Sequence, residues 1–238
     1  MTISLNKVKS MNRKSKIAVA IAVVIVIFAG FMIYENSPHY DPQTKVLANT
    51  SIGTVEKITC GNPNATVEIA LITGIHPRET LSIEPEIKAA EEYAGKDVKI
   101  INYKVTVTDH PQDYNLGRAN GESLVHDYVN PDVTKSNAKA VIIAHSHIPE
   151  YGEGFYLATP AMDSASVKIA EKINETSDFN YYPVTGNETY KSTSAVLVSR
   201  PIAEAGYPTF VYEIPENIKE QDSTDKTKEL FDLICKNL

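Results

Sequence analysis

The sequence contains little cysteine, and it shows no internal repeat and no low-complexity segment. Of its 238 residues only Cys60 and Cys235 are cysteines, and no C-x-x-C pair supports a zinc site built from thiolates. The two cysteines are either a disulfide that ties the start of a domain to its last helix, or two unrelated buried thiols. A hydrophobic fraction of 42% and a charged fraction of 22% are ordinary for a folded protein and exclude a disordered chain.

Charge is absent from residues 17–34, which read IAVAIAVVIVIFAGFMIY. A bilayer core of roughly 30 Å is crossed by about 20 apolar residues in a helix, so this segment predicts a transmembrane anchor. Acidic residues are also absent before it, where the basic residues are Lys7, Lys9, Arg13, Lys14 and Lys16. Positive charge stays on the cytoplasmic side, which places the N-terminus inside and the rest of the chain outside. A cleaved secretory signal is the alternative, and it exports the domain equally.

The chain therefore divides into a basic cytoplasmic tail (residues 1–16), an anchor (17–34), a linker (35–53) and one folded domain (54–238). Patterns for N-glycosylation agree with export, and they begin at Asn49, Asn64, Asn174 and Asn187. The whole chain has a net charge of −7, and the part beyond the basic tail is more acidic still. An acidic exterior argues against nucleic acid as a partner and suits either solubility or a cationic substrate.

Strand and helix patterns alternate along the domain. Short apolar or alternating runs predict strands at residues 67–72, 98–107, 140–144 and 209–212. Amphipathic or capped segments predict helices at residues 81–93, 164–173, 194–204 and 223–237. Such alternation predicts an α/β fold with a mixed, mostly parallel central sheet and helices on both faces.

Side chains that bind metals follow these predicted strands. In α/β sheets the ligand site lies beyond the carboxyl ends of the strands, so the residues at those ends are the first to inspect. They are His76 and Glu79 after the first strand, Asp109 and His110 after the second, His145 and His147 after the third, and Glu213 after the last. Loops of random polar composition would rarely be so rich in histidine and carboxylate.

A catalytic zinc ion needs three protein ligands and an open position for water. His76 and Glu79 are three residues apart across a turn shaped by Gly74 and Pro77, close enough to hold one ion. His145 is the expected third ligand because it follows a buried strand directly, and His147 is the alternative, or a residue that orients a ligand. Glu213, at a rigid strand end, is the candidate general base for a zinc-activated water.

These residues resemble the zinc carboxypeptidases. That family has a Gly-x-His-x-Arg-Glu segment after a strand, matched here by Gly74, His76, Arg78 and Glu79. It has a later histidine followed by serine, as in His145-Ser146. Its catalytic glutamate lies in a Thr-Phe-Glu-like strand near the C-terminus, which Thr209-Phe210 and Glu213 resemble with two residues inserted. The resemblance spans about residues 54–237 and implies one Zn²⁺ held by His76, Glu79 and His145, with Glu213 as the catalytic residue.

The same resemblance implies which residues bind the substrate. The family grips a substrate carboxylate through an Asn-Arg motif, and Asn115 and Arg118 occupy that place without being adjacent. Arg78 would lie beside the metal and contact the substrate too. Tyr190, 23 residues before Glu213, is the counterpart of a mobile tyrosine of the family.

Three hypotheses about function follow. The first is an extracytoplasmic, membrane-anchored zinc hydrolase that cleaves peptides or a peptide-containing cell-wall polymer. The second keeps zinc but acts on a small N-acyl amino acid, as the related desuccinylase and aspartoacylase group does, because the domain is short for a classical carboxypeptidase. The third is a surface binding module with a vestigial fold.

Overall fold

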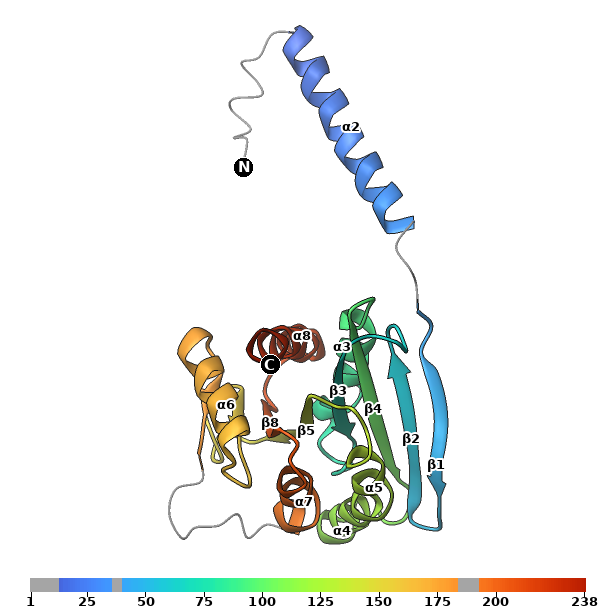
Figure 1. Cartoon of the computed structure of the whole chain (residues 1–238), viewed down its shortest axis with the longest axis vertical. Helices are drawn as coiled ribbons and strands as arrows, with labels where there is room; N and C mark the ends of the chain where they lie inside the picture. The colour runs from blue at the N-terminus through green and yellow to red at the C-terminus, as the bar shows by residue number, and fades with distance from the viewer. Residues whose placement is uncertain (1–12, 36–39, 184–192) are drawn as a thin grey trace. The chain divides into compact units, whose positions relative to one another are not determined.

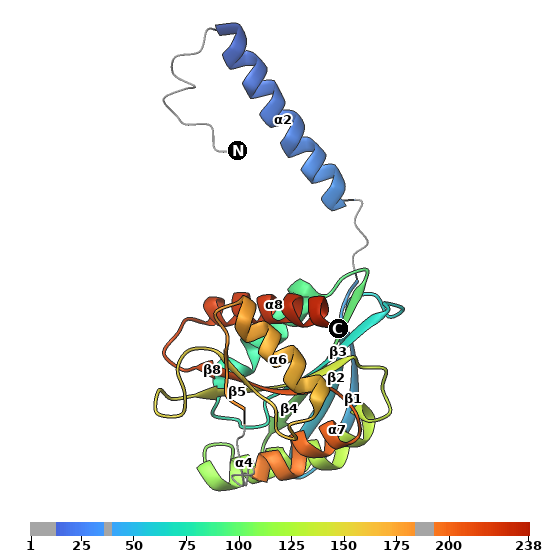
Figure 2. The same ribbon diagram turned by 60° about the vertical axis from the view of Figure 1, so that its left-hand side comes forward.

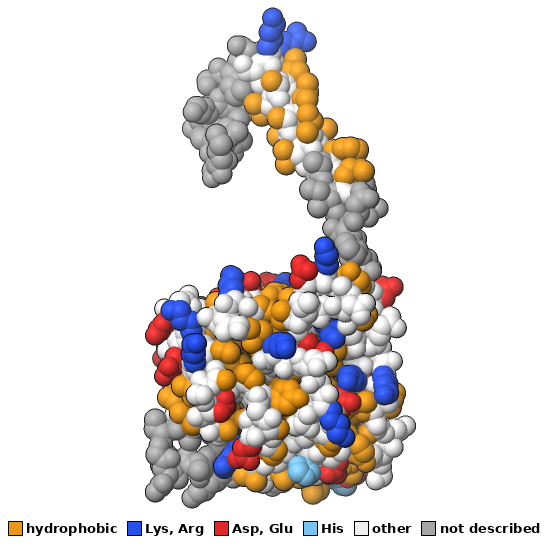
Figure 3. Space-filling view, viewed as in Figure 1, with side chains coloured by type: hydrophobic (Ala, Val, Ile, Leu, Met, Phe, Trp, Pro, Cys, Tyr) orange, Lys and Arg blue, Asp and Glu red, His pale blue; other side chains and the backbone are white. Residues whose placement is uncertain are grey.

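The structure is a computed structural model that describes residues 13–35, 40–183 and 193–238. It divides into two compact units, Met1–His39 and Tyr40–Leu238. The described part of the first unit is helix α2 (Arg13–Glu35). Most of its described apolar side chains are exposed, among them Ile21 and Val26, and hydrophobic side chains lie on its surface in Figure 3. Within the described residues, no helix has the combination of length and apolar character that is needed to cross a membrane. The anchor predicted over residues 17–34 therefore stays a prediction.

The described part of the second unit contains one eight-stranded sheet, in the order β1-β2-β4-β3-β5-β8-β6-β7; Figure 1 labels the strands from β1 to β8 of this order. The strands are β1 (Gln43–Asn49), β2 (Gly53–Cys60), β3 (Val67–Thr73), β4 (Val98–Val107), β5 (Ala140–His147), β6 (Tyr156–Ala158), β7 (Asn180–Tyr181) and β8 (Thr209–Pro215). The central strands β4, β3, β5 and β8 are parallel. The pairs β1–β2, β2–β4 and β6–β8 are antiparallel, and β7 pairs in parallel with β6. The predicted mixed α/β sheet is confirmed.

Helices cover both faces of this sheet (Figures 1 and 2). On one face lie α3 (Glu84–Tyr93), α6 (Ser164–Thr176) and α8 (Glu220–Asn237), whose apolar side chains form one core cluster with the sheet. On the other lie α4 (Tyr114–Leu124), η2 (Val125–Val129), α5 (Asn130–Val133), η3 (Ala195–Ser199) and α7 (Arg200–Glu204), in a second cluster. A short 3₁₀ turn, η1 (Thr80–Ser82), precedes α3.

Side-chain alternation in the central strands decides which residues reach the site. In β5, Ile142 packs in the α3/α6/α8 cluster, whereas Val141 and Ile143 pack in the α4/α5/α7 cluster. Successive side chains of a strand point to opposite faces, so His145 continues the row of Val141 and Ile143. Glu213 continues the corresponding row of β8, and the strand register places it directly opposite His145. Both side chains therefore belong to the face of the sheet covered by α4 and η3.

Several predicted elements differ from the structure in ways that have local causes. The predicted linker ends at residue 53, but residues 43–49 form strand β1, which pairs with β2; residues 36–39 lie outside the described residues. The helix predicted at residues 81–93 is split into η1 and α3, because Pro85 sits in the first turn of α3. The helix predicted at residues 194–204 begins with the π-helical turn η3.

Candidate active site

The loop after β3 carries His76 and Glu79, and Gly74 shapes it. Gly74 has a φ of 78°, and a Cβ atom there would lie 2.1 Å from the carbonyl oxygen of Val105, so only glycine fits. The backbone N–H of Glu79 donates to the carbonyl of His76 at 3.1 Å, and the Ser82 hydroxyl donates to the carbonyl of Glu79 at 2.8 Å. These bonds fix the backbone from which the two side chains extend.

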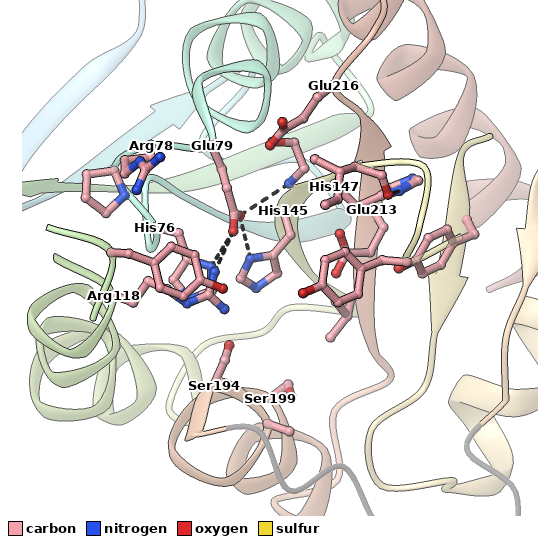
Figure 4. A pocket seen from close by; sticks show the side chains of 18 of the residues that line it. His76, Arg78, Glu79, Arg118, His145, His147, Ser194, Ser199, Glu213 and Glu216 are labelled. Atoms are coloured by element: carbon pink, nitrogen blue, oxygen red, sulfur yellow. Dashed lines mark hydrogen bonds and ion pairs between the residues drawn. The ribbon is translucent and has the colours of Figure 1, made fainter. Parts of the chain in front are cut away.

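The side chains of His76, Glu79 and His145 converge on one point (Figure 4). Each offers one ligand atom, and these atoms all lie within 4.8 Å of one another. The Nδ1 atom of His76 is 2.7 Å from one carboxylate oxygen of Glu79, and the Nδ1 atom of His145 is 2.9 Å from the other. The predicted set of three is thus brought together from a loop and from β5.

These three residues fit a zinc ion by their chemistry and burial. Two imidazole nitrogens and one carboxylate oxygen form a ligand set typical of catalytic zinc. His76 and His145 expose only 3% and 5% of their surface. Grouping such polar side chains away from water is costly unless they share a cation or protons. Within the described parts of the chain, this is the group of three or more metal-binding side chains close enough to hold one ion.

Glu122 contacts the other side of His76, and sequence reasoning missed it. Its carboxylate oxygen lies 3.3 Å from Nε2 of His76, and its side chain is only 3% exposed. Glu122 is on α4, next to Gly121, where a Cβ atom would lie 1.8 Å from the carbonyl oxygen of Ile75. The glycine lets α4 approach the loop. A carboxylate that accepts a hydrogen bond from Nε2 fixes the imidazole so that Nδ1 faces the metal position, and it makes Nδ1 a more basic metal ligand.

The carboxylate of Glu79 is held in its charged form. Burial alone would raise its pKa, but the charge of His145 and hydrogen bonds with both histidines outweigh burial and hold the pKa well below its usual range. Burial likewise opposes the charged form of His76, yet its hydrogen bonds with Glu122 and Glu79 raise its pKa. The ionised carboxylate of Glu79 thus supplies negative charge that would compensate a metal cation bound between the two histidines.

The sequence predicts that Glu213 follows its strand. In the structure Glu213 lies inside β8, because the strand continues to Pro215. Burial raises the pKa of Glu213 to about 7; the charge of His145 lowers it and that of Glu79 raises it. A carboxyl group that titrates near neutral pH can both accept and donate a proton. Its place beside His145 suits the role of general base.

Two arginines and a tyrosine form the edge of the site on the side of α4. Arg118 donates to the Glu79 carboxylate at 2.9 Å. Its guanidinium also lies 5.2 Å from the ring centre of Tyr114, and that of Arg78 lies 5.9 Å from the same ring. Arg118, predicted to bind substrate, is therefore bonded to the predicted metal ligand Glu79, whereas Arg78 is not. Both arginines border the pocket in front of the metal-binding group.

The structure places the remaining predicted residues elsewhere. Asn115 does not line the pocket that contains the metal-binding group; it lines a second cavity, of about 340 Å³, that Arg118 also borders. His147 lines the main pocket, but its ring nitrogens lie 3.0 and 2.9 Å from the carbonyl oxygens of Ile148 and Gly154, so it braces the following loop instead of a ligand. Tyr190 and Asn187 lie outside the described residues.

The pocket in front of these residues has a volume of about 720 Å³. It is hereafter called the site pocket. Its lining combines the metal-binding group with Glu213, the two arginines, several tyrosines and three serines; the serines are Ser146, Ser194 and Ser199. This volume lies within the range of clefts that bind small molecules and short peptide segments.

The two cysteines are free thiols in the structure, Cys60 buried and Cys235 partly buried. This corresponds to the second of the two alternatives left by the sequence. Burial raises the pKa of the Cys60 thiol to about 11, with a further contribution from the charge of Glu91. A thiol held protonated in this way is a poor nucleophile and a poor metal ligand.

The domain has the zinc carboxypeptidase-like fold. It superposes on a candidate carboxypeptidase from Burkholderia mallei with a TM-score of 0.60 and 13% identity, covering 88% of this chain and 66% of that one. A metallo-carboxypeptidase from Burkholderia cenocepacia gives a TM-score of 0.58 and 13% identity, covering 85% and 65%.

A third similar structure is the product-bound cell shape determinant protein Csd4 from Helicobacter pylori, with a TM-score of 0.50 and 9% identity, covering 77% of this chain and 55% of that one. The chain thus spans less than two thirds of the length of each of these three proteins. At the level of sequence alone, no protein-family model and no curated protein matches.

Proposed function

We propose that this protein is a zinc-dependent hydrolase that cleaves a peptide or related amide bond. The observation that carries the proposal is the convergence of His76, Glu79 and His145 in a pocket that also contains Glu213. The fold supports it, since the similar structures include a metallo-carboxypeptidase. Fold alone does not define an activity, so the weight rests on the site.

The residues of the site divide the chemistry among them. Zinc held by His76, Glu79 and His145 would polarise an amide carbonyl and lower the pKa of a water molecule. Glu213 takes the proton from the attacking water and delivers it to the leaving nitrogen. Glu122 keeps His76 in place by accepting from Nε2. Arg118 is bonded to Glu79, and Arg78 gives the same side of the pocket positive charge that suits a substrate carboxylate.

Metal analysis of the purified protein tests the proposal. One zinc per chain is expected, together with hydrolysis of blocked dipeptides, and His76→Ala should lose both because it removes one of three ligands. Glu122→Gln should bind zinc roughly 10–100-fold more weakly without losing it, because it weakens the support of His76 alone.

Glu175→Gln is the matched control, because it makes the same chemical change at an exposed residue of α6 away from the site. A wild-type protein without stoichiometric zinc would exclude a zinc hydrolase. Zinc with turnover of N-acyl amino acids but of no peptide would move the assignment to the second hypothesis of an amidohydrolase.

We also propose that residues 17–34 anchor the protein in the cell membrane, with the hydrolase domain outside. The uncharged sequence of this segment, the basic residues before it and the exposed apolar side chains of α2 support this. The full chain should be recovered with membranes and be degraded by protease added to intact cells, whereas a chain lacking residues 1–34 should not remain membrane-bound. Recovery of the full chain in the soluble fraction would contradict the anchor.

A further inference from the structure

One wall of the site pocket is formed by η3, across from the metal-binding histidines. Figure 4 shows Ser194 and Ser199 on this wall, with His76 and His145 on the opposite side. Ala195 of η3 and Val211 of β8 complete it. Ser194 and Ser199 are thus the polar residues of this wall, beside the apolar Ala195 and Val211.

The backbone of this wall is fixed by a π-helical turn that has a clear cause in the sequence. Pro201 has no N–H and therefore cannot bond to the carbonyl of Leu197, and the N–H of Arg200 bonds five residues back to Ala195. The carbonyl of Leu197 accepts instead from the side-chain amide of Asn130 at 2.9 Å and lies 3.0 Å from Nδ1 of His126. Tertiary contacts therefore hold η3 in this shape.

The hydroxyl of Ser199 has no hydrogen-bond partner among the described residues, unlike those of the buried serines Ser166 and Ser223. Ser199 is 1% exposed, and no donor or acceptor among the described residues bonds to its hydroxyl oxygen. By contrast, Ser166 accepts from the N–H of Thr209 at 2.8 Å, and Ser223 donates to Glu86 at 3.2 Å. A buried hydroxyl without a partner costs free energy, and a bound ligand that supplies the missing hydrogen bond recovers that cost.

The position of Glu213 identifies the part of the substrate that meets this wall. Val211 and Glu213 are two residues apart in β8 and so share a face, and β8 and η3 are in contact. Glu213 must reach the leaving nitrogen in order to protonate it. The side chain of the residue that supplies that nitrogen therefore lies nearest to Val211 and Ser199.

We propose that Ser199, with Ser194 beside it, is a specificity residue that selects substrates with a small hydrogen-bonding side chain on the leaving-amine side of the scissile bond. This inference rests on the proposed hydrolase function. The hydroxyl of Ser199 bonds to the polar group of such a side chain. An apolar side chain of the same size leaves this hydroxyl unpaired. Discrimination between isosteric side chains follows from that difference.

The test uses the zinc-loaded full chain and two isosteric pairs of blocked dipeptides: N-acetyl-Ala-Thr with N-acetyl-Ala-Val, and N-acetyl-Ala-Asn with N-acetyl-Ala-Leu. Each is supplied as the free acid and as the C-terminal amide, so that either mode of cleavage is read. The wild-type protein should prefer the polar member of each pair in kcat/KM by roughly five- to tenfold. Ser199→Ala should abolish that preference and leave the Tm unchanged or raised, because it removes an unpaired hydroxyl.

Ser166→Ala is the matched control, a buried serine that has a partner. It should lower the Tm and leave both selectivity ratios as in the wild-type protein. Unchanged ratios in Ser199→Ala, or a fall in its Tm equal to that of Ser166→Ala, would overturn the inference while the hydrolase function stands. If the wild-type protein cleaves no substrate of the panel, the proposed function fails, and the inference fails with it.

Discussion

Replacing Glu213 by glutamine is expected to lower kcat/KM for peptide hydrolysis by roughly 10²- to 10⁴-fold while zinc stays bound. Glutamine has nearly the same shape but cannot take a proton from water or pass it to a leaving amine. Glu213 is not one of the three converging ligands, so its replacement leaves His76, Glu79 and His145 intact. A large loss of rate with full metal content is the signature that separates a general base from a ligand.

The measurement pairs steady-state kinetics with metal analysis of the same sample. Glu220→Gln serves as the control, because Glu220 is exposed in the first turn of α8 and lies away from the site pocket. If Glu213→Gln keeps both zinc and the wild-type rate, Glu213 is not the base. If it loses zinc, the carboxylate takes part in holding the metal, and the division of roles proposed above is wrong.

The metal-binding part of the site could be predicted because its signals are local. His76 and Glu79 are separated by one turn of loop, and His145 follows an apolar strand whose alternation is visible in the sequence. Parallel strands bring their carboxyl ends to one edge of a sheet, which joins these segments without knowledge of the fold. The same rule found Glu213, although β8 continues past it.

Glu122 and Ser199 could not be found in this way. Glu122 reaches His76 only because Gly121 lets α4 approach the loop at Ile75, a contact between segments 46 residues apart. Ser199 faces the pocket because Pro201 and Asn130 together impose a π-helical turn. Both effects depend on tertiary packing, and neither leaves a periodic pattern in the sequence.

The role predicted for Arg118 also depends on tertiary contacts that the sequence does not reveal. Its type and place suit a clamp on a substrate carboxylate, and the resemblance to the zinc carboxypeptidases favoured that role. In the structure its guanidinium bonds to Glu79 and lies over Tyr114. A carboxylate within the protein is thus its partner, which a spacing argument cannot distinguish from a carboxylate on a substrate.

Glu86 provides the second large effect, on stability rather than on rate. It is fully buried on α3, where Thr227 donates at 2.8 Å to its carboxylate and Ser223 donates at 3.2 Å. None of the ion pairs formed by the described residues includes Glu86. Burial raises the pKa of Glu86 to about 8, and the hydrogen bonds from Thr227 and Ser223 only partly oppose this. The folded protein therefore keeps this carboxyl group protonated over a range in which the unfolded chain releases the proton.

The direction of the pH dependence follows from this difference. The folded pKa of Glu86 lies above the unfolded value of 4.5. The stability that protonated Glu86 contributes is therefore fully present below pH 4.5, and it is lost progressively as the pH rises from 4.5 through about 8. The loss attributable to Glu86 is of order 4 kcal/mol by pH 8. Glu86→Gln keeps the shape and a neutral hydrogen-bonding group at all pH values. It should match the wild-type protein near pH 5 and be the more stable of the two near pH 8.

Urea unfolding of both proteins between pH 5 and pH 9 measures this difference. Glu213 also has a raised pKa, about 7, so the variant keeps a residual decline of the same sign, and only the difference between the two curves reports on Glu86. Glu91→Gln is the matched control, since Glu91 is exposed on the same helix and its replacement should leave the curve of the wild-type protein unchanged. Parallel curves for Glu86→Gln and the wild-type protein would mean that Glu86 is ionised in the folded state, with its charge compensated by a contact other than Thr227 and Ser223.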